Sequence, residues 1–172
     1  MWHALNNFLP EYKRDTGAGL YRRSLYTFWR RTTPSPNMLV LDATTREVCS
    51  VRRPFTMTPL QPLVLLNDPQ FVEAARALGE RLLRERGDTP EKRVAWAFRE
   101  VVGRLATEGE REELRGLYAD QLAYFSEDAS RCDKLLKVGD HKHDATLPKV
   151  DLAAAATTAG ALLNLDATFM LR

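Results

Sequence analysis

The stretch LAAAATTAGALLNL, residues 152–165, decides how this chain folds. Its side chains are apolar or small almost all round a helix, and a helix without a polar face is normally buried on every side. We therefore expect it to form the central helix of a bundle, where the alanines at 153–156 let neighbouring helices approach closely. Leu162, Leu163 and Leu165 would fill the remaining gaps in the core.

Three amphipathic segments precede this stretch, and each has its own start signal. Asp68-Pro69 and Thr89-Pro90 each place a capping residue before a proline that suits the first helical position. Thr107 and Glu110 form the T-x-x-E pattern of a capping box. Apolar residues then recur at helical spacing, namely Phe71, Ala75, Leu78 and Leu82, then Val94, Ala97, Phe98, Val101 and Leu105, then Leu114, Leu117, Tyr118, Leu122 and Phe125.

Glycines mark two of the predicted ends. The first of these helices should stop at Gly87, and a shorter segment through Cys132, Leu135 and Leu136 should stop at Gly139. Residues 67–172 are therefore predicted to form a helical body.

The first 66 residues are less regular and are predicted to form an arm. Leu20 to Arg31 can form a helix, which Pro34 and Pro36 would end. Thr58-Pro59 signals another short helix, Leu60 to Leu66.

Between these helices, Leu39-Val40-Leu41 and Val48-Cys49-Ser50-Val51 are short enough to pair as a β-hairpin, and extended loop fits them equally well. The predicted fold class is thus mainly α. We expect one domain over residues 1–172, a bundle of five to six helices with an irregular N-terminal arm and room for one short hairpin.

Charge is divided unevenly along the chain. Its 172 residues carry a net charge of +2, but residues 1–53 hold nine Lys or Arg against four Asp or Glu, and the remainder holds sixteen against nineteen. The arm is therefore basic at +5 and the body acidic at −3. An excess of this size is modest for a nucleic-acid binder, so we expect no nucleic-acid partner.

Several functional classes lack their sequence signals. No apolar run approaches the roughly 20 residues of a membrane span, and the first residues do not resemble a signal peptide. Cys49 and Cys132 form no C-x-x-C, and C-x-x-C-H haem attachment and phosphate-binding glycine loops are absent. We find no catalytic triad and no metal motif, so the sequence favours a chain that is not an enzyme on its own and holds no cofactor or metal.

An ordered series of motifs carries a family resemblance. The chain resembles the C-terminal domain of unknown function (family 1553) of large planctomycete-type proteins associated with cytochrome c. The matching stretches are spread along the chain from residue 20 to residue 166: Leu20 to Thr32, Leu41-Asp42-Ala43, Arg46 to Cys49, Thr58 to Gln61, Leu63 to Asp68, and Leu162 to Asp166.

The resemblance implies a multidomain setting. In such proteins the domain follows a cytochrome c-like region and a second uncharacterised domain, sometimes with a lectin-like module between them. We therefore expect an extracytoplasmic protein of which this chain is the C-terminal portion, with any haem upstream and the upstream domains as partners. The family has no established activity to carry over.

One polar string is the main candidate for a site. Asp42, Arg46, Glu47, Arg52 and Arg53 lie within twelve residues of chain, close to Cys49. Under one interpretation, these charges pair with each other and order an irregular loop. Under the alternative, Arg46, Arg52 and Arg53 bind an anionic or polysaccharide ligand, and Asp42 or Glu47 acts as acid or base. The carbohydrate suggestion comes only from the lectin-like companions.

Two further segments have alternative interpretations. The basic-aromatic segment from Tyr21 to Arg31 could stack on bases or sugars, but helical spacing favours packing of Leu25, Phe28 and Trp29 in the core. His141-Lys142-His143 contains metal ligands, but without further spaced ligands it is predicted to be an exposed polar turn. Cys49 is interpreted as a spectator thiol, because no histidine is placed near it.

These observations support two hypotheses for function. The first is a non-catalytic helical module that packs against, or scaffolds, the other domains of a larger protein. The second is a binding or hydrolytic site for an anionic ligand, centred on residues 42–53.

Overall fold

The computed structural model describes residues 15–27, 29, 34–44, 48–52, 56, 58–85 and 89–169. Within these ranges the chain forms eight α-helices and two 3-10 turns, and no strand. It divides into two compact units, Met1–Val64 (unit 1) and Leu65–Arg172 (unit 2). The mainly α class is confirmed, with more helices than the five to six expected and no hairpin in the described residues.

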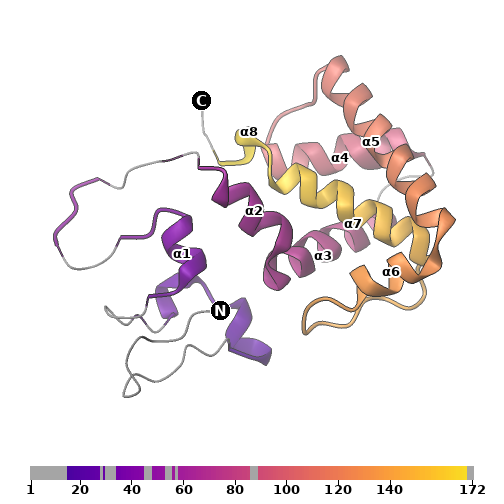
Figure 1. The fold of residues 1–172 in the computed structure, drawn as a ribbon. Coiled ribbons are helices and arrows are strands. Elements are labelled where there is room, and N and C mark those ends of the chain that lie inside the picture. Colours follow the sequence, from indigo (N-terminus) through magenta and orange to yellow (C-terminus); the bar gives the residue numbers. More distant parts are fainter. Residues whose placement is uncertain are drawn as a thin grey trace. The chain divides into compact units, whose positions relative to one another are not determined.

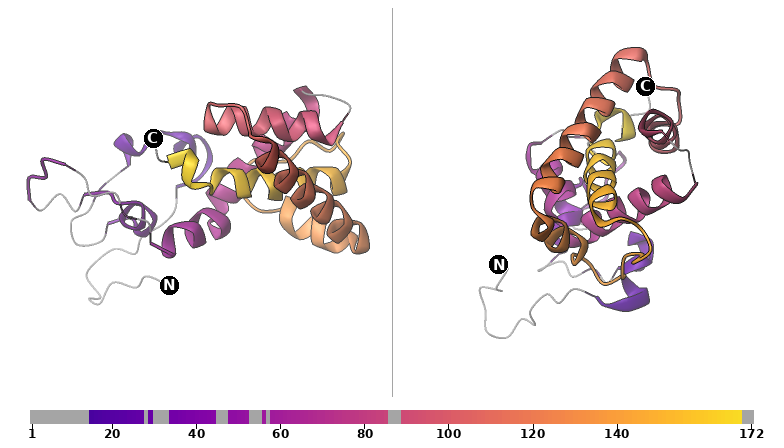
Figure 2. Two further views of the ribbon diagram at one scale, coloured as in Figure 1. Left: turned by 90° about the horizontal axis from the view of Figure 1, so that it is seen from above. Right: turned by 90° about the vertical axis from the view of Figure 1, so that its right-hand side faces the viewer.

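Unit 2 is a bundle built around one helix. Its helices are α3 (Pro69–Glu85), α4 (Pro90–Val102), α5 (Glu108–Glu127), α6 (Ala129–Leu136), α7 (Lys149–Leu163) and α8 (Asp166–Phe169). Helices α3, α4, α5 and α6 all pack on α7, which runs through the middle of the bundle (Figures 1 and 2). Leu152, Leu162 and the alanines at 153–156 are buried, which confirms the expectation of a central helix.

The helix starts of unit 2 lie where the local signals predicted them. Pro69 and Pro90 are the first residues of α3 and α4. At α5, the Thr107 hydroxyl accepts from the Glu110 N–H, and the Glu110 carboxylate accepts from the Thr107 N–H at 2.8 Å, a complete capping box. The predicted end of α3, Gly87, lies outside the described residues, and α6 ends at Leu136, before Gly139.

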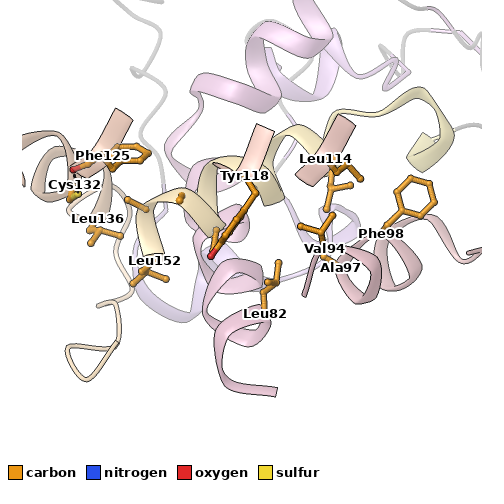
Figure 3. Close-up of a cluster of buried hydrophobic side chains, with 14 residues drawn as sticks. Leu82, Val94, Ala97, Phe98, Leu114, Tyr118, Phe125, Cys132, Leu136 and Leu152 are labelled. Atoms are coloured by element: carbon orange, nitrogen blue, oxygen red, sulfur yellow. Dashed lines mark hydrogen bonds between the residues drawn. The ribbon is translucent and has the colours of Figure 1, made fainter. Parts of the chain in front are cut away.

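The apolar core of unit 2 extends along α7. Figure 3 shows Phe125, Cys132, Leu136 and Leu152 gathered at one end and Val94, Ala97, Phe98 and Leu114 at the other, with Tyr118 and Leu82 between them. These side chains come from α3, α4, α5, α6 and α7, so one continuous core joins five helices of the bundle.

Helices α3 and α7 approach each other closely at Gly79. A Cβ atom at this position would lie 2.8 Å from the nitrogen of Ala156 and 3.0 Å from the carbonyl carbon of Ala155. Only a residue without a side chain fits there, and small residues on both helices are what allow the contact.

Unit 1 differs from the predicted arm in two places. The expected helix from Leu20 to Arg31 is wrong over its described residues, which form the 3-10 turns η1 (Gly17–Tyr21) and η2 (Ser24–Tyr26). Arg22 and Arg23 between them have extended ψ angles of 148° and 144°. A short helix in water is marginal without a buried face, and Leu25 here is 73% exposed.

The possible hairpin is also wrong in its first strand, because residues 36–40 form helix α1 (Pro36–Val40). Ser35 is extended and Pro36 takes the first helical position, so the prolines start a helix here. The helix ends at Val40, and two residues later Asp42 has a φ of 59°, in the left-handed region. The turn of the expected hairpin is residues 43–46, of which Thr45 and Arg46 lie outside the described residues.

Helix α2 (Leu60–Asn67) begins directly after Thr58-Pro59, close to the predicted position. No helix among the described residues is long and apolar enough to cross a membrane.

Candidate functional site

Asp42 is the member of the predicted polar string that the structure places best. One oxygen of its carboxylate accepts from the Thr56 hydroxyl at 2.7 Å, and the other accepts from the Thr56 N–H at 2.8 Å. The second oxygen also accepts from Nε2 of Gln61 at 3.2 Å, and that nitrogen donates to the Val40 carbonyl at 3.0 Å. We call this set of contacts the Asp42 clamp.

The clamp joins two of the stretches that carry the family resemblance, Leu41-Asp42-Ala43 and Thr58 to Gln61. Asp42 lies just after the end of α1, and Gln61 lies in the first turn of α2, so the clamp ties α1 to the start of α2 within unit 1. The hydroxyl and backbone N–H of Thr56 hold the pKa of Asp42 below its usual range. A carboxylate that is ionised and occupied on both oxygens is well suited to holding the chain in place.

The remaining members of the polar string are less fully placed. Arg52 and Cys49 are exposed, and the Arg52 carbonyl accepts from the Ser50 hydroxyl at 3.1 Å. Arg46, Glu47 and Arg53 lie outside the described residues. An acid or base role for Asp42 or Glu47, and anion binding by Arg46, Arg52 and Arg53, stay predictions.

Residues 21–26 of the basic-aromatic segment face solvent, against the expectation of core packing for Leu25, whereas Trp29 is partly buried. Leu25 and Tyr26 are 73% and 63% exposed, and Tyr21 is also exposed. The extended backbone at Arg22 and Arg23 breaks the helical register that would have gathered the apolar residues on one face. Phe28, Arg30 and Arg31 lie outside the described residues.

A second polar cluster, in unit 2, was missed by the sequence analysis. Glu73, Arg76 and Glu80 on α3 are buried. Nη1 of Arg76 donates to the carbonyls of Leu136 at 2.7 Å and Val138 at 2.8 Å, and Nη2 donates to the His141 carbonyl. The guanidinium therefore caps the carboxyl end of α6, where carbonyls lack helical partners.

The carboxylates of α3 hold the same loop by its amides. Glu73 accepts from the N–H of Asp140 at 2.5 Å and of His141 at 3.1 Å, and Glu80 accepts from the N–H of Asp144 at 3.3 Å. Gly139 has a φ of 94°, and a Cβ there would collide with Glu73. We call Glu73, Arg76 and Glu80 with residues 136–144 the loop clamp.

Arg84 extends the loop clamp toward solvent. Its Nε donates to the Asp144 carboxylate at 3.0 Å, and the Thr146 hydroxyl and N–H bind the other oxygen. These contacts lower the pKa of Asp144 to about 2, chiefly through the Thr146 N–H. In the sequence, the sign of this cluster is the spacing of residues 73, 76, 80 and 84, which places four charged side chains along one helix face.

The loop clamp fixes the backbone of the predicted metal-capable turn without completing a metal site. His141 and Lys142 are exposed and His143 is partly buried, as a polar turn requires. Among the described residues, no group of three or more His, Cys, Asp or Glu side chains could hold a metal ion.

The two cysteines are free and differ in environment. Cys49 is exposed, and Cys132 is buried with its Sγ 3.8 Å from the Phe125 carbonyl. Burial raises the pKa of Cys132, which makes it a poor nucleophile.

Comparison with known proteins gives one match. A family model described as PSD1, protein of unknown function (DUF1553), matches residues 4–118, from unit 1 into α5. The similarity noted at Leu162 to Asp166 lies beyond the matched residues. No curated protein and no solved structure matches the chain.

Proposed function

The chain belongs to the PSD1 family of proteins of unknown function (DUF1553), and on this premise we propose that it is a non-catalytic helical module that packs against other domains of a larger protein. The observation that carries the proposal is the exposure of large apolar side chains in unit 1. Leu39 and Leu41 are exposed at the end of α1, and Leu60 and Leu63 are more than half exposed on α2.

The Asp42 clamp brings these leucines into one region. Gln61, next to Leu60, binds the carbonyl of Val40, which lies between the two leucines of α1. Large apolar side chains that are exposed in one region of a folded protein are typical of interaction surfaces. We therefore infer that this region of unit 1, the α1–α2 face, is covered by another domain.

The polar groups support a non-catalytic role. Both oxygens of Asp42 are occupied by donors from the chain itself, and the buried charges of α3 bind the loop of unit 2. The carboxylates of Asp42 and Glu73 therefore bind backbone N–H groups of this chain, which is a structural role.

The setting of the module is a second part of the proposal, and the family resemblance supports it. We place the module outside the cytoplasm, in a protein that also carries a cytochrome c-like region, which would hold the haem. Fractionation of the source cells, with detection of this chain by antibody, tests the placement. Recovery only with cytoplasmic markers would refute it.

The packing role can be tested by crosslinking in the intact native protein. A photo-crosslinking amino acid replaces Leu63 on the α1–α2 face or, as a control, Leu105, which is 73% exposed in unit 2. We expect Leu63 to crosslink to sequence outside residues 1–172 and Leu105 not to. Absence of such crosslinks from both Leu63 and Leu60 would refute the proposal.

A further inference from the structure

Resting on the proposed function, we propose that residues 21–26 form an interaction surface for an acidic protein partner. Carboxylates of the partner would bind Arg22 and Arg23, and its apolar side chains would cover Leu25 and Tyr26. This surface is separate in sequence from the α1–α2 face.

The exposed side chains of this segment are those that dominate protein interfaces. Tyr21, Leu25 and Tyr26 are all more than half exposed, and Arg22 and Arg23 are exposed between them. Tyrosine and arginine are enriched among the residues that carry most of the binding energy.

Two arginines of this segment have no partner among the described residues, unlike six of the arginines of unit 2. Arg22 and Arg23 form no ion pair or side-chain hydrogen bond with the described residues, and neither does Arg52. Six arginines of unit 2 each pair with a carboxylate of their own unit; they are Arg76, Arg81, Arg84, Arg104, Arg111 and Arg131. Unpaired guanidinium groups in an N-terminal arm of net charge +5 favour an acidic partner.

Leu25 favours a protein over a polyanion. A nucleic acid or sulfated polysaccharide could pair with the arginines, but it has no aliphatic surface to cover a leucine that is 73% exposed. A protein supplies carboxylates and apolar side chains together.

The backbone of the surface is ordered before binding. The Tyr26 N–H donates to the Arg23 carbonyl at 2.9 Å, and the Thr27 N–H donates to the Ser24 carbonyl at 3.1 Å. A turn that is already formed loses less conformational freedom on association, which favours affinity.

The charge preference can be measured with two synthetic probes. These are fluorescent amphipathic peptides of equal length with leucine on one face and either glutamate or lysine on the other. We expect the whole chain to bind the Glu/Leu peptide about tenfold more tightly than the Lys/Leu peptide by fluorescence anisotropy. The double variant Arg22→Glu/Arg23→Glu should abolish this preference, and Leu25→Ser should weaken binding of the Glu/Leu peptide.

A matched control separates local from net charge. Lys134→Glu/Lys137→Glu makes the same change of charge at exposed positions of unit 2 and should leave the preference intact. Equal loss in both double variants would overturn the proposal, and so would equal binding of the two peptides. Tighter binding of heparin or single-stranded RNA than of the Glu/Leu peptide would also overturn it, in favour of a polyanion site. Thermal melts establish that each variant is folded.

The peptide and crosslinking experiments can refute the two proposals separately. Crosslinks from Leu63 without a charge preference would refute this surface alone. Absence of crosslinks from the α1–α2 face would refute the packing role, whichever peptide the chain binds.

Discussion

Unit 2 packs most of its described large apolar side chains into or against one continuous core, whereas the described part of unit 1 leaves most of its own exposed. In unit 1 Leu20 is buried, while Leu25, Leu60 and Leu63 are more than half exposed. Arginines differ in a similar way: six described arginines of unit 2 pair with carboxylates, whereas Arg22, Arg23 and Arg52 of unit 1 have no such pair among the described residues. The same residue types therefore stabilise one unit and are available for binding in the other.

The largest expected effect tests whether arginines of unit 2 are structural. Arg76→Met removes three hydrogen bonds to carbonyls of residues 136–141 and takes away one of the two arginines that lie 3.9 Å from the buried Glu80 carboxylate. We expect a loss of about 3–5 kcal/mol of unfolding free energy, measured by urea denaturation. If binding is the main role of Arg22, the same substitution there leaves stability unchanged.

Arg81→Met is the matched control for Arg76→Met on the same helix. Arg81 is half exposed and lies 3.6 Å from Glu100, so its loss should cost at most about 1 kcal/mol. Equal losses for Arg76 and Arg81 would contradict a structural role for the buried pair.

Leucines give the second test. Leu162→Ala removes a fully buried side chain of α7 and should cost about 2–5 kcal/mol. Leu63→Ala on the α1–α2 face should change stability by no more than about 0.5 kcal/mol. Thermal or urea unfolding measures both, and similar small losses would show that the core of unit 2 does not depend on α7.

Gly79→Ala tests the close approach of α3 and α7, and Gly116→Ala on α5 is its control. The two substitutions should change stability in opposite directions. Gly79→Ala adds a Cβ at 2.8 Å from the Ala156 nitrogen, and such overpacking costs about 1–3 kcal/mol. Gly116→Ala on α5 meets nothing within 4 Å, so the higher helix propensity of alanine should add about 0.5–1 kcal/mol. A gain in both variants would show that the two helices can separate without cost.

The smallest expected effect concerns the capping box of α5. Hydrogen bonds from Arg104, and then from the Thr107 N–H, lower the pKa of Glu110 to about 2. Since the folded pKa is below the unfolded value of about 4.3, the carboxylate stabilises the fold above that pH, and the contribution is lost as the pH falls through 2.

Glu110→Gln should therefore lower the Tm at neutral pH by roughly 1–2 °C, because Glu110 and Arg104 are both partly exposed to solvent. The difference should shrink toward pH 2 in melts followed by circular dichroism. Glu112→Gln, at an exposed position on the same helix outside the capping box, should show no such pH dependence. A difference that persists at pH 2 would contradict the assignment.

The sequence predicted the features of this fold that depend on neighbouring residues. Thr89-Pro90 and the Thr107–Glu110 box started helices where expected, and the alanines of α7 indicated a central position. Local patterns could not predict Glu73 and Arg76 as buried, because their partners lie more than sixty residues away.

The candidate site was harder to predict for the same reason. The string containing Asp42 was singled out, but its partners Thr56 and Gln61 are neutral side chains that no charge pattern reveals. Leu25 was assigned to a core because helical spacing says nothing about whether a facing element exists. Which side chains are buried or paired in each unit thus depends on contacts between residues far apart in the sequence, and local patterns do not reveal these contacts.

The loop clamp also has a consequence for the order in which unit 2 folds. Residues 136–144 form no helix after Leu136, yet the amides of Asp140 and His141 are bound by Glu73, a residue of α3. Their amide hydrogens should exchange with deuterium slowly, as in a helix interior, although they belong to a loop. Because closing so long a segment of chain is entropically costly, the loop can take its final form only after α3 and α7 have met. The loop is then a late-folding element whose exchange protection reports on the packing of α3.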